Sequence, residues 1–138
     1  MNRRNVLWCS LALTFGWACG SGSTEPVAVA SVAGTWTLST VNAKPLPYVF
    51  GASDPKLEVI DKKYVISAAN TFTTSLTVRS TELDGSVSTA STSGSGTLTL
   101  SNNTVTFTYA GDGSVAIATV TPTSMTFSAG PVQEFTRQ

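Results

Sequence analysis

The sequence predicts an all-β domain, an antiparallel up-and-down meander that closes into a barrel of roughly eight strands. Apolar and polar residues alternate with a period of two from position 34 onward, and threonine, valine and phenylalanine are frequent in the alternating runs. None of these runs has the 3.6-residue period of a helix. Turn signals separate the runs at short intervals, and short turns join antiparallel neighbours.

The first predicted strand is 34–40, in which Trp36 and Leu38 alternate with threonine and serine. The other strands are expected at 56–61, 64–67, 71–80, 96–100, 104–109, 114–120, 124–128 and 133–137. Lys62 and Lys63, between two of these runs, are interpreted as a solvated turn. A long meander that does not close has edge strands with unpaired backbone N–H and C=O groups, so a barrel is favoured. The alternative is a two-layer sandwich, which composition alone does not exclude.

The alternation also predicts which large apolar side chains point into the barrel. They are Trp36, Leu38, Leu57, Val59, Ile66, Phe72, Leu76, Val78, Leu98, Leu100, Val105, Phe107, Ile117, Met125, Phe127 and Phe135. A barrel of eight strands is just wide enough to be filled by such side chains or to hold one small ligand. The sequence therefore leaves a solid and a hollow interior both open.

Two stretches depart from the alternation. Residues 86–95 are nearly all serine, threonine, alanine and glycine, which indicates either a weak exposed strand or loop, or a wall of small side chains that leaves space inside the barrel. The connection 42–55 is long, contains three prolines and has an apolar tip with Tyr48 and Phe50. We expect Tyr48 and Phe50 to fold over the barrel mouth as ligand-binding residues; the alternative is a static plug that completes the core.

The N-terminal segment has the order basic, apolar, small that is typical of an export signal, so 1–18 is predicted to be a signal peptide. Its apolar run is shorter than the ~20 residues needed to span a bilayer. Cys19, which ends this run and precedes Gly-Ser-Gly-Ser, resembles the lipidation site of bacterial lipoproteins. We then expect 19–32 to be a tether, 33–138 to be the domain, and the protein to be anchored in the outer membrane of the cell envelope, facing the periplasm or the surface. Ordinary signal cleavage after Ala30 is the alternative.

Composition argues against several classes of function. From Cys19 onward there are six basic and eight acidic residues with no basic stripe, so no nucleic-acid partner is expected. The sequence has no histidine, and both cysteines lie in the first 19 residues, which excludes Ser/His and Cys/His nucleophile systems in the domain. Asp84-Gly85 and Asp112-Gly113 are interpreted as turns, not calcium loops. The sequence predicts no enzyme, no cofactor and no metal site.

Gly34-x-Trp36 opens the first strand, hairpins follow, and Phe135-Thr136-Arg137 closes the last strand. In these features the chain resembles the lipocalin-like domains of small bacterial lipoproteins. The resemblance implies a lipocalin-like barrel in which Trp36 plugs one end and Arg137 packs over its indole as a structural partner. It also implies a small hydrophobic molecule as ligand, in or at the mouth of the barrel. The alternatives are a solid barrel that acts through protein or glycan contacts, and a passive structural component.

Overall fold

The computed structural model of the protein describes residues 31–138. The predicted signal peptide (1–18), Cys19 and all but the last two residues of the predicted tether (19–32) lie outside this part of the chain. Within residues 31–138, no helix is long and apolar enough to cross a membrane. The strands are β1 (Gly34–Val41), β2 (Lys44–Pro45), β3 (Tyr48–Gly51), β4 (Lys56–Ile66), β5 (Thr71–Thr81), β6 (Val87–Ser101), β7 (Thr104–Tyr109), β8 (Val115–Val120), β9 (Ser124–Phe127) and β10 (Gln133–Arg137).

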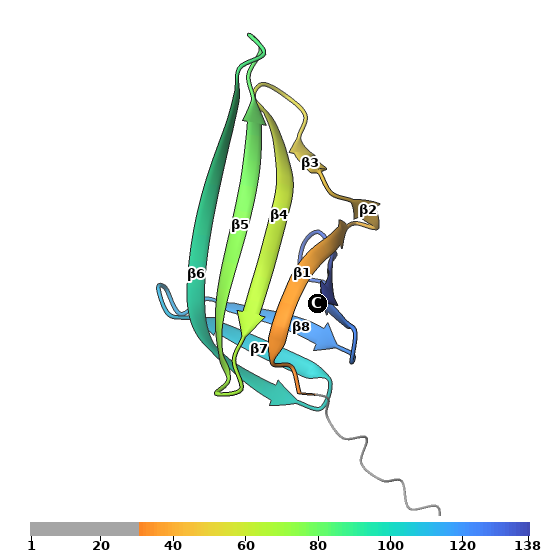
Figure 1. The fold of residues 1–138 in the computed structure, drawn as a ribbon, viewed down its shortest axis with the longest axis vertical. Coiled ribbons are helices and arrows are strands. Elements are labelled where there is room, and N and C mark those ends of the chain that lie inside the picture. Colours follow the sequence, from red (N-terminus) through yellow and green to blue (C-terminus); the bar gives the residue numbers. More distant parts are fainter. Residues whose placement is uncertain (1–30) are drawn as a thin grey trace, which may run out of the picture.

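The strands form one antiparallel sheet that closes on itself. Consecutive strands from β4 to β10 pair with one another, β10 pairs with β1, and β1 pairs back with β4. Eight strands, β1 and β4 to β10, therefore make a closed barrel, and Figure 1 shows β1 alongside the lower part of β4. The predicted meander barrel is confirmed, and the two-layer sandwich is not formed.

The long connection between the first two barrel strands contributes the short strands β2 and β3. β1 pairs with only one half of β4, at 63–66. β3 takes the place of β1 along the other half, where Tyr48 lies opposite Val59. We call these two parts of the barrel the Trp36 end and the Tyr48 end, after the residue of each that pairs with β4. The connection thus extends the wall of the barrel at the Tyr48 end (Figure 1).

β4 corrects the interpretation of Lys62 and Lys63 as a solvated turn. They lie inside one continuous strand, opposite Leu76 and Ser75 of β5. A β-bulge between Val59 and Asp61 inserts one extra residue, which shifts the alternation of side chains by one position. As a result Lys62 faces the interior together with Val59. Sequence periodicity missed this because a bulge breaks the period of two.

The Trp36 end of the barrel is filled by aromatic side chains. Tyr64 lies at their centre, with ring centroids 5.9 Å from Phe72, 5.1 Å from Phe107, 5.5 Å from Phe127 and 5.3 Å from Phe135. Tyr64 is 1 % exposed. Buried aromatic rings contribute large apolar areas and prefer such offset and edge-on geometries. This half of the interior is solid.

β8 has the opposite register from the one predicted. Ile117 was expected inside but is 55 % exposed, whereas Ala118 is 1 % exposed. Ala118 lies opposite Val105 of β7 and Phe127 of β9, both of which are buried. Directly opposed residues point to the same face of a sheet, so the two neighbouring strands decide the register of β8. Its own sequence, in which alanine, isoleucine and valine occur at adjacent positions, is compatible with either.

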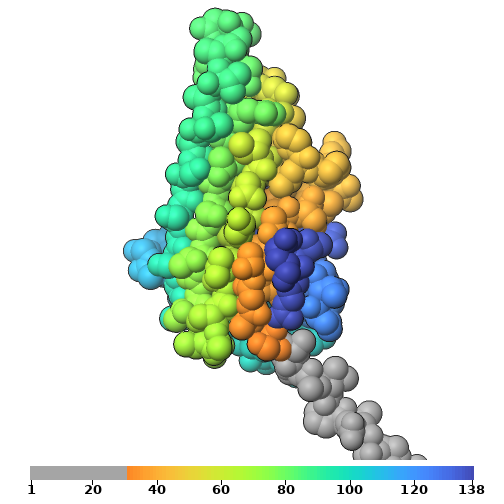
Figure 2. Space-filling model, in the orientation of Figure 1, coloured from red at the N-terminus to blue at the C-terminus, as the bar shows by residue number. Residues whose placement is uncertain are grey.

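Within residues 86–95, Ser86 ends the turn after β5 and 87–95 form an exposed part of β6, as one of the two interpretations predicted. β6 pairs with β5 from Val87 to Thr97, but its pairing with β7 begins only at Gly96. The other edge of 87–95 therefore has no neighbouring strand in the described part of the chain. In Figure 2 the hairpin of β5 and β6 projects beyond the body of the molecule. Thr92 and Gly94 also border a cavity against β5.

Candidate ligand-binding site

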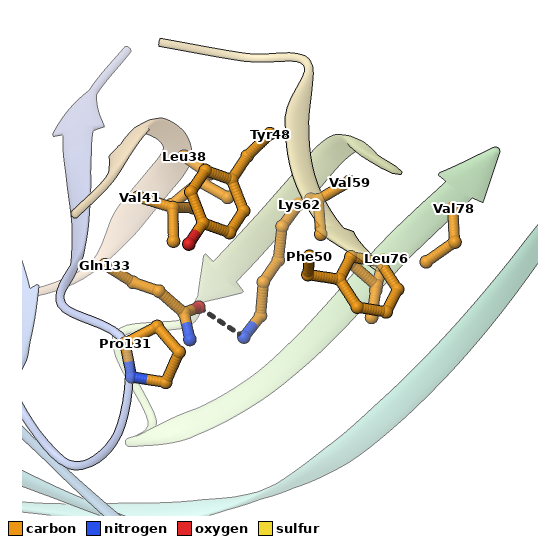
Figure 3. Close-up of a pocket in the computed structure, with 10 residues that line it drawn as sticks. All are labelled: Leu38, Val41, Tyr48, Phe50, Val59, Lys62, Leu76, Val78, Pro131 and Gln133. Carbon is orange, nitrogen blue, oxygen red and sulfur yellow. Dashed lines mark hydrogen bonds between the residues drawn. The ribbon is translucent and has the colours of Figure 1, made fainter. Parts of the chain in front are cut away.

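A cavity of about 270 Å³ lies at the Tyr48 end of the barrel. Its wall comes from β1, β3, β4 and β5, from Pro131, and from Gln133 at the start of β10 (Figure 3). Six of its ten lining residues are aliphatic or proline: Leu38, Val41, Val59, Leu76, Val78 and Pro131. Apolar surface of this kind favours an apolar occupant because burial removes that surface from water.

The two aromatic residues predicted from the sequence, Tyr48 and Phe50, both line this cavity from β3 (Figure 3). Phe50 is 53 % exposed, so its ring borders both the cavity and solvent. Val49, between them, is not part of the lining. The structure therefore brings the two predicted residues together with apolar residues of β1, β4 and β5 that are distant in sequence.

Asn42 fastens the connection to the barrel. Its side-chain Nδ2 donates to the hydroxyl of Tyr48 at 3.0 Å, and its Oδ1 accepts from the backbone N–H of Val132 at 2.9 Å. Asn42 and Ala43 both have positive φ, 50° and 61°, which is the backbone of a tight two-residue hairpin turn between β1 and β2. Through Asn42 these bonds link Tyr48, which pairs with β4 on its other side, to the segment before β10.

Lys62 is the charged residue of the cavity and was missed by the sequence analysis. Its Nζ donates to Oε1 of Gln133 at 2.8 Å, as drawn in Figure 3. The ammonium also lies 5.7 Å from the ring centroid of Tyr64 and 5.8 Å from that of Phe135, within range of cation–π attraction. Burial lowers the pKa of Lys62 below its ordinary value, because a low-dielectric surrounding disfavours the charged form.

Two more cavities border Lys62. One, of about 360 Å³, is lined by Lys62, Gln133, Tyr64 and Tyr109 together with residues of β8 and β9. The other, of about 280 Å³, lies against β5 and β6 and is again lined by Lys62 and Tyr109. Lys62 thus borders all three cavities.

The hydroxyls of Tyr64 and Tyr109 lie 2.7 Å apart at the boundary between the aromatic cluster and these spaces. Burial, followed by the hydrogen bond to Tyr109, raises the pKa of Tyr64. Tyr64 is therefore a neutral phenol near neutral pH. The two hydroxyls carry two protons, of which one forms the hydrogen bond between them and the other is free to be donated to a third group. Together with Lys62 this makes the centre of the barrel rich in hydrogen-bond donors.

Trp36 and Arg137 lie next to each other at the far end of the barrel. They are paired in register between β1 and β10, and the guanidinium carbon lies 4.8 Å from the centroid of the fully buried indole. Arg137 Nη2 donates to the carbonyl oxygens of Ala33, at 2.8 Å, and of Ser31. The Trp36 Nε1–H donates to the carbonyl of Val32 at 2.9 Å.

Val32, placed in the tether by the sequence analysis, is 4 % exposed and belongs to the hydrophobic core. The last two residues of the predicted tether, 31–32, thus already make contacts with side chains of the barrel. The backbone there is held by the two side chains that cover this end, Trp36 and Arg137.

No carboxylate of residues 31–138 lines the three cavities that Lys62 borders. Glu58 is buried on the outer side of β4, where hydrogen bonds from Lys56 and then Arg79, at 2.9 and 2.8 Å, lower its pKa. Asp84 and Asp112 each accept a hydrogen bond from a backbone N–H two residues later, at 2.8 and 2.9 Å, as expected for turns. Among residues 31–138, no cluster of three or more Cys, Asp or Glu side chains is arranged to hold a metal ion.

Comparison with known proteins assigns the chain to a family. It has no significant match among curated proteins and none among solved structures. The model of a family described as "Lipocalin-like domain" matches residues 32–127, well over half of the chain. The matched region begins at the strand-opening Trp36 segment and extends through β9. With its closed eight-stranded meander and this match, the chain belongs to the lipocalin-like domain family.

Proposed function

We propose that this protein is exported, is anchored to the outer membrane of a bacterial envelope through a lipid on Cys19, and binds one small apolar molecule at the Tyr48 end of its barrel. It acts by binding, not by catalysis. The observation that carries the proposal is the asymmetry of the interior. Aromatic side chains fill one half, and an apolar cavity of about 270 Å³ with two aromatic residues on an added strand occupies the other.

Family membership supports the same proposal, since lipocalin-like barrels commonly bind small ligands. Tyr48 and Phe50 are its proposed ligand contacts. They come from a strand that is added to the barrel wall and tied through Asn42, so they cover the cavity without belonging to the aromatic cluster. Trp36 and Arg137 are proposed to have a structural role at the other end.

A neutral apolar fluorescent probe tests the ligand site. We expect the wild-type protein to bind the probe, and Tyr48→Ala/Phe50→Ala to weaken binding by at least about tenfold, a loss of about 1.4 kcal/mol. The melting temperature should fall only modestly. Tyr48→Ala removes the hydrogen bond from Asn42 and a partly buried ring, but Phe50 is half exposed and the fully buried aromatic cluster stays intact. Val49→Ala, on the same strand but outside the lining, is the matched control and should preserve binding.

A different result would favour the competing functions. If no probe binds to the wild-type protein and the double variant melts at a much lower temperature, Tyr48 and Phe50 complete a solid core. The protein would then act through protein or glycan contacts or serve as a passive envelope component. Native mass spectrometry of protein purified from its host would show whether a small molecule is retained.

The lipid anchor is tested separately with Cys19→Ser in the full chain. We expect the wild-type protein in the membrane fraction and the variant in the soluble periplasm or the medium, because a thiol is needed for the lipid attachment. A variant that still sediments with membranes would contradict the anchor. An N-terminus at Ser31 in the mature wild-type protein would establish ordinary cleavage instead.

A further inference from the structure

The interior of the barrel carries one positive charge that no acidic side chain balances. Lys62 is the only charged residue in the lining of the three cavities described above, and none of their lining residues is Asp or Glu. The only hydrogen-bond acceptor found for its ammonium in residues 31–138 is the neutral amide oxygen of Gln133, at 2.8 Å. A desolvated ammonium is unfavourable unless it is paired with an acceptor of opposite charge. The pocket is therefore complementary to an anion.

The other polar groups beside Lys62 are also donors. The Oε1 of Gln133 is engaged by Lys62, so its Nε2 is the group left to contact an occupant. The hydroxyl pair of Tyr64 and Tyr109 has one proton in excess of its mutual bond, and burial keeps Tyr64 protonated. A cluster of donors around one ammonium matches a head group that consists of hydrogen-bond acceptors.

The rest of the pocket matches an apolar chain. Val59, Leu76 and Val78 continue along β4 and β5 from Lys62 toward the end where Phe50 borders solvent (Figure 3). Beyond Lys62 in the other direction lies the packed aromatic cluster around Tyr64. An occupant that contacts both surfaces has its anionic group deep in the barrel and its apolar chain toward the Tyr48 end.

We propose that the ligand is an amphiphilic monocarboxylate, an alkyl-chain carboxylic acid, whose carboxylate is bound by Lys62 and Gln133. This proposal rests on the proposed function and adds the chemistry of the head group. One ammonium balances the single charge of a carboxylate. A phosphate monoester carries about −1.5 to −2 near neutral pH and would leave part of its charge buried and unpaired.

The test compares three ligands that share one chain: dodecanoate, dodecan-1-ol and dodecyl phosphate. Each displaces a neutral fluorescent probe from the full-length protein at pH 7. Dodecan-1-ol is kept below its solubility limit, and the two anionic ligands are kept below the concentration at which they form micelles. We expect the wild-type protein to bind dodecanoate at least about tenfold more tightly than dodecan-1-ol, since a hydrogen bond to a charged group is stronger than one between neutral groups. It should also bind dodecanoate more tightly than dodecyl phosphate.

Two variants locate the preference. Lys62→Met keeps the length and apolar stem of the side chain, and it should remove the preference for dodecanoate while retaining the affinity for dodecan-1-ol. Lys63→Met removes the same charge from the next position of β4, which lines none of the three cavities, and should behave as the wild type. Lys62→Gln is a second variant that keeps a hydrogen-bond donor, and it should lose most of the preference as well.

The outcomes separate this inference from the proposed function. If neither the probe nor any of the three ligands binds to the wild-type protein, the proposed function fails and the inference with it. If the probe and dodecan-1-ol bind but dodecanoate binds no more tightly, the inference alone is wrong. It is also wrong if dodecyl phosphate binds most tightly, or if folded Lys62→Met or Lys62→Gln protein keeps the full preference. The wild-type comparison needs no variant to fold.

Discussion

At the scale of single residues, Trp36 and Arg137 show how one contact joins the two ends of the described chain. The indole is fully buried, the guanidinium lies 4.8 Å from its centroid, and Arg137 also donates to the carbonyl oxygens of Ala33 and Ser31. A guanidinium keeps its charge and stacks on an aromatic face while its edge donates hydrogen bonds. Arg137 thereby holds both the indole and the backbone that precedes β1.

The contact predicts coupled losses of stability. Trp36→Ala should lower the free energy of unfolding by about 3–5 kcal/mol, because it removes a large buried side chain. Arg137→Ala should cost less, and the double variant should cost less than the sum of the two, because either change abolishes the same stacking contact. Denaturant unfolding of the four proteins measures the coupling, with Thr136→Ala as an exposed control on β10. Additive effects would mean that the two side chains do not interact.

At the scale of the elements, the approach of β6 to β5 and β7 depends on a missing side chain. A Cβ at Gly96 would lie 2.0 Å from the carbonyl oxygen of Thr108 and 2.9 Å from the Cε1 of Phe72. Both distances are shorter than any normal contact, so glycine is required where the aromatic cluster and the neighbouring backbone meet. The small residues of 86–95 suggested empty space inside the barrel. At the neighbouring Gly96, the missing side chain instead allows the backbone of β7 and the ring of Phe72 to pack closely.

Gly96→Ala should therefore destabilise the protein by about 1–3 kcal/mol or more, because the added methyl must displace backbone or a packed ring. Gly111→Ala is the matched control: a Cβ there meets no atom within 4 Å, and its effect should stay within about 0.5 kcal/mol. Thermal and denaturant unfolding compare the two variants with the wild type. Equal stability of both variants would contradict the close approach at Gly96.

At the scale of the whole molecule, the barrel consists of a packed part and a part that extends past its closure. The Trp36 end has neighbours on both sides of every strand and an aromatic interior. At the other end, no strand of residues 31–138 pairs with the second edge of β6 over 87–95, and β3 takes the place of β1 beside β4. The largest fully buried side chains all belong to the first part: Trp36, Tyr64, Phe72, Phe107, Phe135, Met125 and Val105. The second part is therefore expected to open more readily.

Amide hydrogen exchange should reveal this division. We expect the slowest exchange around Trp36, Phe107 and Met125, which are fully buried, and faster exchange over 87–95. Amides of the packed part open only with the whole barrel, whereas those of an exposed hairpin open by local fluctuation. Equal protection over both regions would show that the molecule unfolds as a single unit without this division.

Much of the architecture could be predicted from local sequence. The prediction failed where neighbouring strands determine which face of a strand points inward. The alternation around Trp36 and Leu38, the turns at Asp84 and Asp112 and the aromatic tip of the long connection are local signals, and the structure contains the corresponding elements. Ile117 was misplaced because the register of β8 is imposed by Val105 and Phe127 on its neighbours.

Alternating side chains, turn residues and glycines act within a few positions of the chain, so the sequence by itself determined an antiparallel meander and favoured its closure into a barrel. The inward position of Lys62, the acceptor it finds on Gln133, and the division into a filled and a hollow half were decided by tertiary structure alone. A bulge and cross-strand pairing determine which face of a strand is interior, and both depend on residues that lie far apart along the chain.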